Sequence, residues 1–235
     1  DKLDMKETII YDYKDILNEK AINYDRIAKS FKPNTNIDTD IHGLNGLYGS
    51  GAIYSTVFDL FKWAKHFKHQ KYFILNNHNY YLMTDYYSSH FGWNLGYEKF
   101  TDKYELFHTG EWLNFRSLIN INLLTNYCFI GLSNSDIDTS KLKKIYNKFN
   151  YLFINKKVSL ITSEALQYYV ETYVSSFNGT VLIGNVHTEE ILAVYSQGKL
   201  NSKSDSPNLK NNTIYRLTSI SKPFYALGAF KLEDL

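Results

Sequence analysis

Apolar and polar residues alternate along several stretches of this chain, with the period of two that is typical of half-buried strands. Four such runs occupy residues 90–134, separated by short polar turns: HFGWNLGYEKF, KYELFHTG, FRSLININLL and NYCFIGLSN. Neighbouring runs joined by turns this short predict an antiparallel meander. Two later runs, NGTVLIGNV and EEILAVYSQG, predict a further pair of strands.

Other stretches repeat their apolar residues with the helical period of 3.6. Residues 57–67 follow a glycine-rich turn and have one apolar face, and Thr56 with Asp59 predicts the cap at its start. Two later helices are predicted at 139–154 and from about 164 to 176. Together these elements predict an α+β fold, in which helices flank an antiparallel sheet of about five strands.

The composition favours a folded domain, because 44% of the 235 residues are hydrophobic and 21% are charged. Lys and Arg number 26 against 24 Asp and Glu, and the resulting net charge of +2 argues against a nucleic-acid partner. No run approaches the ~20 apolar residues of a membrane-spanning helix. The single cysteine, Cys128, excludes an intrachain disulfide and lies in a run that predicts a packed strand.

A further helix is predicted to begin at Ser219 and to close the chain, and the segment YRLTSISKPF at its start contains candidate chemistry. Ser219 and Lys222 are three residues apart, and residues with this spacing are neighbours on a helix surface. A serine hydroxyl needs a base to take its proton, and a neutral lysine amine can do so. The positive end of the helix and partial burial would both disfavour the charged amine. Serine is also a common helix cap and lysine a common surface residue, so the spacing alone admits a purely structural role.

A second candidate motif ends one of the predicted strands. The run ELFHTGEW places His108, Thr109 and Gly110 there, followed by Glu111. A basic side chain and a hydroxyl suit a substrate carboxylate or a developing negative charge, and a glycine lets a substrate backbone lie close to the strand. The backbone N–H groups of Glu111 and Ser219 are candidate donors to an oxyanion. The alternative is a turn that simply ends the strand.

These two motifs stand in a sequence that resembles the class C β-lactamase-like serine hydrolases, which include penicillin-binding proteins, D-Ala-D-Ala peptidases and esterases. The resemblance extends to FNGTVLIGN and NNTIYRLTSISKPF, and to LDMKETII, GLYGSGAIYSTVFDLFKWAKHF, FGWNLGYE, HTGEWLNFRSLININ and CFIGLSNSD. It implies an acyl-enzyme mechanism with Ser219 as nucleophile, Lys222 as its base, and His108 with Thr109 orienting the substrate. The implied substrate is an amide, a lactam or an ester, such as a cell-wall peptide. The resemblance also implies the cell envelope as location, and no metal or cofactor.

The chain departs from the family in two respects. Residues 1–156 resemble the closing half of the family domain and residues 164–235 its opening half, joined by the linker 157–163. The family's Tyr-x-Asn motif, whose tyrosine serves as base or proton relay, begins at none of the 21 tyrosines. A circular permutant, a fragment, a concatenation of two segments and the junction of tandem domains all fit this order. The two halves together predict one sheet domain.

The family's missing middle region predicts a functional protein longer than this chain, with the missing piece joining Leu235 to Asp1 in space. Without that piece, the Ser219 helix is expected to lack covering neighbours, and Phe224, Tyr225 and Phe230 to have too few partners. Ser219 is expected to lie within about a residue's reach of the His108–Gly110 strand. If Ser219 and Thr109 lie on opposite faces of the sheet instead, the family resemblance is misleading and the Ser-Lys spacing is only a helix start.

Two further interpretations bear on function. A catalytically silent relative would bind a cell-wall peptide or a protein partner without turnover. His66 and His69 have the spacing of two metal ligands on a helix, but no carboxylate–histidine set accompanies them, so a solvated helix end is the favoured interpretation. His108 stands where penicillin-recognising enzymes more commonly have lysine, which favours an esterase or peptidase over a β-lactamase.

Overall fold

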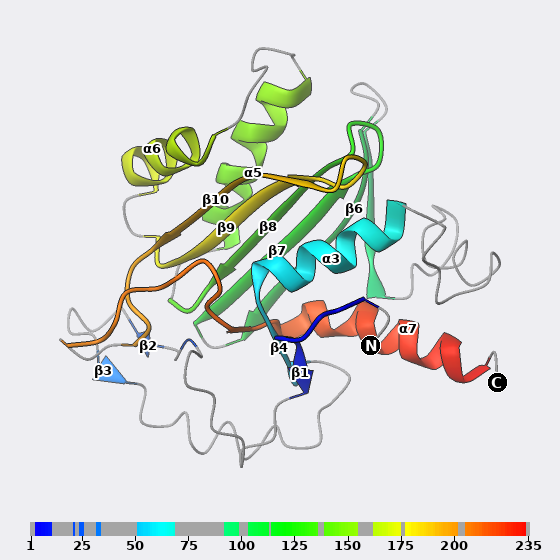
Figure 1. Ribbon diagram of the computed structural model, residues 1–235, viewed down its shortest axis with the longest axis horizontal. Coiled ribbons are helices and arrows are strands. Elements are labelled where there is room, and N and C mark those ends of the chain that lie inside the picture. The colour runs from blue at the N-terminus through cyan, green and yellow to red at the C-terminus, as the bar shows by residue number, and fades with distance from the viewer. Residues whose placement is uncertain are drawn as a thin grey trace.

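The computed structural model describes residues 3–10, 21, 24–25, 32–33, 51–68, 92–98, 103–112, 114–135, 139–154, 162–174, 177–201 and 205–233. These residues form a central antiparallel sheet with helices on both faces (Figure 1). The strand order in this sheet is β10-β9-β8-β7-β6-β5. The expected α+β class is therefore confirmed, with six strands where about five were expected.

The strands of the central sheet correspond to the apolar runs of the sequence. They are β5 (Asn94–Glu98), β6 (Lys103–Trp112), β7 (Phe115–Asn122), β8 (Tyr127–Ser133), β9 (Gly179–Asn185) and β10 (Glu190–Gln197). From β5 to β8 each strand pairs with the next, which is the predicted meander. β9 then pairs with β8 although two helices separate them in the chain. The two halves of the chain thus contribute to one sheet.

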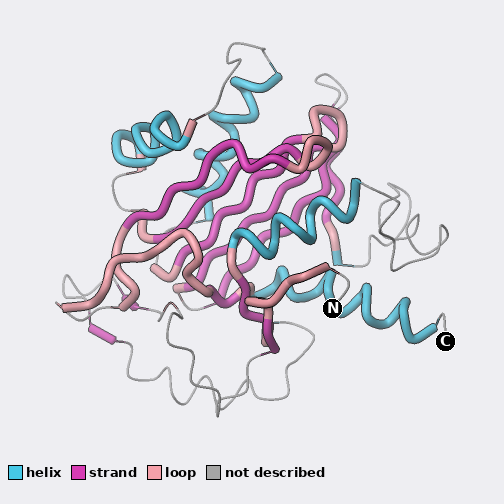
Figure 2. Tube along the Cα trace, in the orientation of Figure 1, coloured by secondary structure: helices cyan, strands magenta, loops and turns pink. Residues whose placement is uncertain are grey.

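Helices cover both faces of the sheet (Figures 1 and 2). On one face lie α5 (Thr139–Ile154) and α6 (Ser163–Tyr173), and on the other lie α3 (Val57–Lys68) and α7 (Ser221–Glu233). α5 has the predicted bounds. α6 ends earlier than predicted, because Val174 leaves the helical region at φ −132° and its N–H closes the last turn on the Val170 carbonyl.

The start of α3 is capped as predicted. The Asp59 N–H donates to Thr56 Oγ1 at 3.1 Å. The Asp59 carboxylate accepts hydrogen bonds from the Glu7 N–H at 2.8 Å and the Thr8 hydroxyl at 3.0 Å. These bonds tie residues 3–10 to the start of α3.

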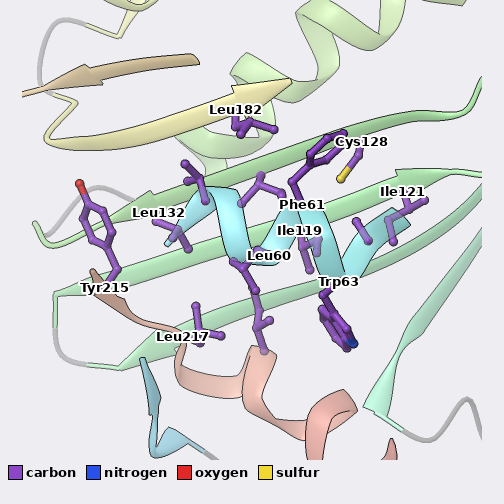
Figure 3. Close-up of a cluster of buried hydrophobic side chains, with 14 of the residues drawn as sticks. Leu60, Phe61, Trp63, Ile119, Ile121, Cys128, Leu132, Leu182, Tyr215 and Leu217 are labelled. Carbon is purple, nitrogen blue, oxygen red and sulfur yellow. The ribbon is translucent and has the colours of Figure 1, made fainter. Parts of the chain in front are cut away.

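The larger hydrophobic core fills the space between the sheet and helices α3 and α7 (Figure 3). Leu60, Phe61 and Trp63 of α3 are buried there against strand residues that include Ile119 and Leu132. Burial of side chains of this size stabilises a fold by about 1.5–3 kcal/mol each. This core therefore fixes α3 on the sheet.

The first turns of α7 are part of the same core. Phe224 stacks on Trp63 with 3.8 Å between the ring centroids, and Trp63 stacks on Trp93 at 5.0 Å. The expectation that Phe224 has too few partners is therefore wrong, because α3 supplies an aromatic ring. Tyr225 is partly buried and also packs against this core, and the side chain of Phe230 lies outside the described part of the structure. The start of α7 is held in place by these contacts.

On the opposite face, α5 and α6 share a second hydrophobic core. Its members come from both helices and from the strands beneath them: Leu118, Phe129, Leu142, Ile145, Phe149, Leu166, Val170, Val174, Phe177, Val181, Ile183 and Ala193. Phe149 of α5 also meets Tyr169 of α6 edge to face, with 5.6 Å between the ring centroids. The two helices therefore pack side by side on one face of the sheet.

A buried carboxylate fixes α5 to β6. Glu105 accepts hydrogen bonds from the Tyr146 hydroxyl, from Asn120 Nδ2 at 2.9 Å and from Asn150 Nδ2 at 3.3 Å. Burial raises the pKa of Tyr146, and the neighbouring Glu105 charge raises it further, so the hydroxyl keeps its proton and remains a donor. The side chain of Glu105 thus shows which face of β6 is turned toward α5.

A small sheet of short strands leads the chain toward Ser219. It contains β1 (Ile9–Ile10), β4 (Ile53–Ser55) and β11 (Tyr215–Arg216), while β2 (Tyr24–Asp25) pairs separately with β3 (Lys32–Pro33). Strands this short carry no readable alternation, and the sequence did not predict them. After β11, the Leu217 N–H donates to the Ile53 carbonyl at 2.9 Å, and Arg216 Nε donates to the Gly51 carbonyl at 2.9 Å. The backbone is therefore fixed just before Ser219.

Candidate functional site

Ser219 and Lys222 meet at the junction of two helical segments. Ser219 belongs to the 3-10 turn η3 (Thr218–Ile220), and Lys222 lies in the first turn of α7. Side chains three residues apart are in line in 3-10 geometry. Lys222 Nζ donates to Ser219 Oγ at 3.2 Å, and Ser219 is half-buried. The structure thus brings the two candidate residues into direct contact.

The environment of Lys222 differs from the expectation. Partial burial was expected, but Lys222 is exposed. Its neighbours Ser221 and Pro223 are buried, so α7 turns their side chains inward and the lysine outward. The backbone of Lys222 is nevertheless enclosed, because a Cβ on Gly92 would lie 2.9 Å from its carbonyl carbon. The expected partial burial of the Lys222 amine is therefore absent.

The residue before Ser219 has an unusual backbone conformation. Thr218 has φ 54°, in the left-handed region that a β-branched residue rarely adopts. Such a conformation costs of order 1–3 kcal/mol and persists only where the surrounding structure enforces it. Leu217 is right-handed helical, so the backbone changes hand at Thr218 and turns from β11 into η3. A strained turn of this kind also presents the nucleophilic serine of α/β-hydrolases.

The Thr218 turn rests on two paired strand residues. Gly110 of β6 and Ser117 of β7 are direct cross-strand partners, and we call this pair the seat. Ser117 Oγ donates to the Leu217 carbonyl at 2.8 Å and lies 3.2 Å from Thr218 Oγ1. A Cβ on Gly110 would lie 1.9 Å from Thr218 Oγ1 and 2.3 Å from Ser117 Oγ. The space that a side chain at Gly110 would need is therefore filled by the turn, and not by the substrate that was expected there.

His108 lies on the same face of β6 as Gly110 and is buried. Its Nδ1 is 2.6 Å from the Thr109 carbonyl oxygen. A carbonyl only accepts, so Nδ1 carries the hydrogen and Nε2 of the neutral ring is an acceptor. Burial lowers the pKa of His108; the bond to Thr109 opposes this, and the charge of Lys222 lowers the pKa further. At neutral pH the His108 ring is therefore uncharged, and the positive charge of Lys222 acts on it.

Thr109 points to the other face of the sheet. Side chains alternate between faces along a strand, and Glu105, four residues earlier, contacts α5. Leu118, the cross-strand partner of Thr109, belongs to the second core beneath α5 and α6. The seat, in contrast, contacts the turn that carries Ser219. Ser219 and the Thr109 side chain therefore lie on opposite faces of the sheet, which is the arrangement expected if the Ser-Lys spacing is only a helix start, and only the Thr109 backbone borders the Ser219 face.

Beyond its short pairing with β5, the outer edge of β6 has no partner strand among the described residues. β5 pairs with residues Lys103 to Phe107, and none of the other strands in the described part of the chain pairs with this edge further on. Unpaired backbone groups on a strand edge are available to an extended ligand. The Glu111 side chain forms an ion pair with Arg116 at 2.9 Å.

Two buried histidines predict a loss of stability in acid. Burial lowers the pKa of both His66 and His108. The unfolded chain takes up these protons near pH 6.5 and the folded chain only at lower pH, so the free energy of unfolding is full above about pH 6.5 and falls below it. Thermal midpoints measured at about pH 7.5 and 5.5 should show this fall. The difference should shrink in His108→Gln; an undiminished difference would show that His108 does not contribute.

Other candidate groups have simpler roles. His66 is 2% exposed, so its interpretation as a solvated helix end is wrong, and His69 lies outside the described residues. Cys128 is buried in the larger core as a packed strand thiol, and burial raises its pKa. In the described ranges, no three His, Cys, Asp or Glu side chains are grouped to hold a metal ion. No helix within those ranges combines the length and the hydropathy needed to cross a membrane.

Sequence reasoning missed two residues of this site, Thr218 and Ser117. A positive φ leaves no mark in a sequence when the residue is threonine, because threonine seldom adopts it. Ser117 had a weak signal, as a small polar residue within the apolar run FRSLININ. A buried serine in such a run needs a hydrogen-bond acceptor, which here is the Leu217 carbonyl.

Comparison of the chain with protein-family models, with curated proteins and with solved structures found no match. The geometry around Ser219 and the resemblance of its motifs are therefore the basis for a functional assignment.

Proposed function

We propose that the protein is a serine hydrolase of the β-lactamase, D-Ala-D-Ala peptidase and esterase type, acting through an acyl-enzyme on Ser219. The observation that carries this proposal is the 3.2 Å hydrogen bond between Lys222 Nζ and Ser219 Oγ, placed directly after the strained Thr218 turn. A serine that only caps a helix needs no strained residue before it, and such strain is concentrated at functional sites.

In the proposed reaction, Lys222 first releases a proton to solvent; Ser219 Oγ then attacks a carbonyl carbon and its proton passes to the neutral amine of Lys222. The backbone N–H groups of Ser219 and Glu111 stabilise the oxyanion. The bond to the leaving group breaks, and Lys222 returns the proton to the departing oxygen or nitrogen. Water then releases the acyl group from Ser219. The Thr109 hydroxyl takes no part, because it faces away from this side of the sheet.

Among possible substrates, we propose esters or amides without a free carboxylate near the scissile bond. His108 is neutral and offers Nε2 as an acceptor, so it can bind an N–H or O–H group but supplies no positive charge to a carboxylate. This property supports the esterase alternative over a lactamase. Beyond Phe107, the β6 edge that faces β5 has no described partner strand, and this supports an extended acyl group that lies along it.

Hydrolysis of a short-chain nitrophenyl ester and of a chromogenic lactam tests this proposal. We expect measurable ester hydrolysis that falls at least about a thousandfold in Ser219→Ala, because removal of a nucleophile has effects of this size. Ser221→Ala is the matched control. It removes a buried hydroxyl of the same turn that has no hydrogen-bond partner in the described structure, and it should keep the activity. Hydrolysis that survives Ser219→Ala would exclude Ser219 as nucleophile.

The second candidate function is a silent relative that binds a cell-wall peptide or a protein partner. The exposure of Lys222 favours it, because partial burial of the amine was part of the argument for a base. The absent Tyr-x-Asn motif favours it as well. This candidate predicts tight ligand binding, no turnover of either substrate, and binding that is unchanged in Ser219→Ala.

A further inference from the structure

We propose that Ser117 is a positioning residue for the nucleophile, which holds the Thr218 turn in the conformation that aims Ser219 Oγ at Lys222. This inference rests on the proposed function of Ser219. Ser117 is far from Ser219 in the sequence, but its hydroxyl contacts both residues that precede Ser219.

The hydrogen bonds of Ser117 converge on the carbonyl that closes the turn. The Leu217 carbonyl accepts from Ser117 Oγ at 2.8 Å, from the Thr218 hydroxyl at 2.6 Å and from the Ile220 N–H at 3.2 Å. The last two donors belong to η3 itself, so Ser117 is the donor that links this carbonyl to the sheet. Ser117 is 0% exposed, and water cannot replace its hydrogen bond without opening the structure.

The sheet is the rigid partner in this contact. Ser117 pairs with Gly110 on one side and with Leu132 on the other, in the middle of the central sheet. Thr218, in contrast, has a conformation that its own backbone disfavours. A reacting group is held in place when its support is locked by a rigid element. We therefore infer that the β6–β7 pair fixes the position of Ser219 through the hydrogen bonds of Ser117.

Loss of the Ser117 hydroxyl should lower reactivity without changing substrate binding. Thr218 would be freer to relax from φ 54°, and Ser219 Oγ would then move relative to Lys222. A displacement of about 1 Å can reduce a rate by about a hundredfold. Ser117 has no exposed surface that a substrate could touch, so the KM for an ester should not change.

The rate of Ser219 labelling by a fluorophosphonate tests this inference. In this reaction the Oγ–P bond forms, fluoride leaves and Lys222 takes the proton. In Ser117→Ala, the labelling rate and the kcat for the nitrophenyl ester should fall by roughly tenfold to a hundredfold, with KM unchanged. Ser133→Ala is the matched control, because Ser133 is another buried serine whose Oγ donates to a backbone carbonyl, that of Asn178 at 2.7 Å. It should lower the thermal midpoint by a similar amount and keep the wild-type labelling rate.

The labelling rates distinguish a failure of this inference from a failure of the proposed function. Wild-type labelling in Ser117→Ala overturns the inference and leaves the proposed function standing, and equal slowing in Ser133→Ala also overturns it. Absence of Ser219 labelling in the wild type overturns the proposed function and the inference together. If Ser117→Ala does not fold, Ser117→Cys keeps the volume of the side chain with a weaker donor. Its labelling should also be slowed, and an unslowed rate in the folded variant overturns the inference.

Discussion

Replacement of Gly110 by alanine is expected to lower the free energy of unfolding by about 3 kcal/mol and to remove most of the reactivity of Ser219. The new Cβ would lie 1.9 Å from Thr218 Oγ1, 2.3 Å from Ser117 Oγ and 2.6 Å from the Leu217 carbonyl oxygen. Because the Leu217 carbonyl belongs to the backbone and both hydroxyls are buried, the Thr218 turn must move away from β6 and β7. Thermal unfolding should shift down by roughly 6–12 °C. Fluorophosphonate labelling should slow at least about a hundredfold.

Gly228→Ala is the control for this prediction, with the opposite expected sign. Gly228 lies in α7, and a Cβ there would meet no described atom within 4 Å. Alanine in an exposed helix position should stabilise the protein by about 0.5–1 kcal/mol and leave the labelling rate unchanged. If Gly110→Ala is as stable and as reactive as the wild type, the turn does not rest on β6 in the way described.

Replacement of Lys222 by methionine is expected to slow acylation of Ser219 by about a thousandfold, because a positioned base contributes roughly 10²–10⁴ to such a rate. Methionine keeps much of the length of the side chain but cannot take the proton. Because Lys222 is exposed, its replacement should change the free energy of unfolding little. The rate is measured by the time course of fluorophosphonate labelling.

Two further variants separate a base from a simple positive charge. Lys222→Arg keeps the charge, but a guanidinium does not lose its proton in proteins, so it should be as slow as Lys222→Met. Lys65→Met is the matched control, because Lys65 forms its ion pair with Glu189 and should not affect labelling. If Lys222→Arg keeps the wild-type rate, Lys222 acts as a charge and not as a base.

The elements with a clear hydrophobic period could be predicted from the sequence. The runs that became β5 to β10 and the helix Thr139–Ile154 were found because burial on one face imposes a period on the residues. The strands of the small sheet were missed, because two or three residues are too few to show a period. Their pairing depends on contacts between distant parts of the chain.

Only the contact between residues close together in the sequence could be predicted at this site. The contact between Ser219 and Lys222 follows from spacing along one helical turn. The contact of Gly110 and Ser117 with the Thr218 turn joins residues that are far apart in the sequence, and no pattern in a single sequence reports it.

The orientation of Thr109 could have been found by counting. It lies four residues after Glu105, and positions an even number apart share a face of the strand. The motif resemblance implies instead that the Thr109 hydroxyl contacts the substrate, which conflicts with the alternation of side chains along β6.

The most direct test of the proposed function is the identity of the residue that carries the adduct after the protein reacts with a labelled fluorophosphonate. Digestion and mass spectrometry of the peptides locate the label. We expect one adduct per chain, on Ser219, which is absent from Ser219→Ala and slow to form in Lys222→Met. An adduct on a different residue, or no adduct under conditions that fully label a reference serine hydrolase, would contradict the proposed function.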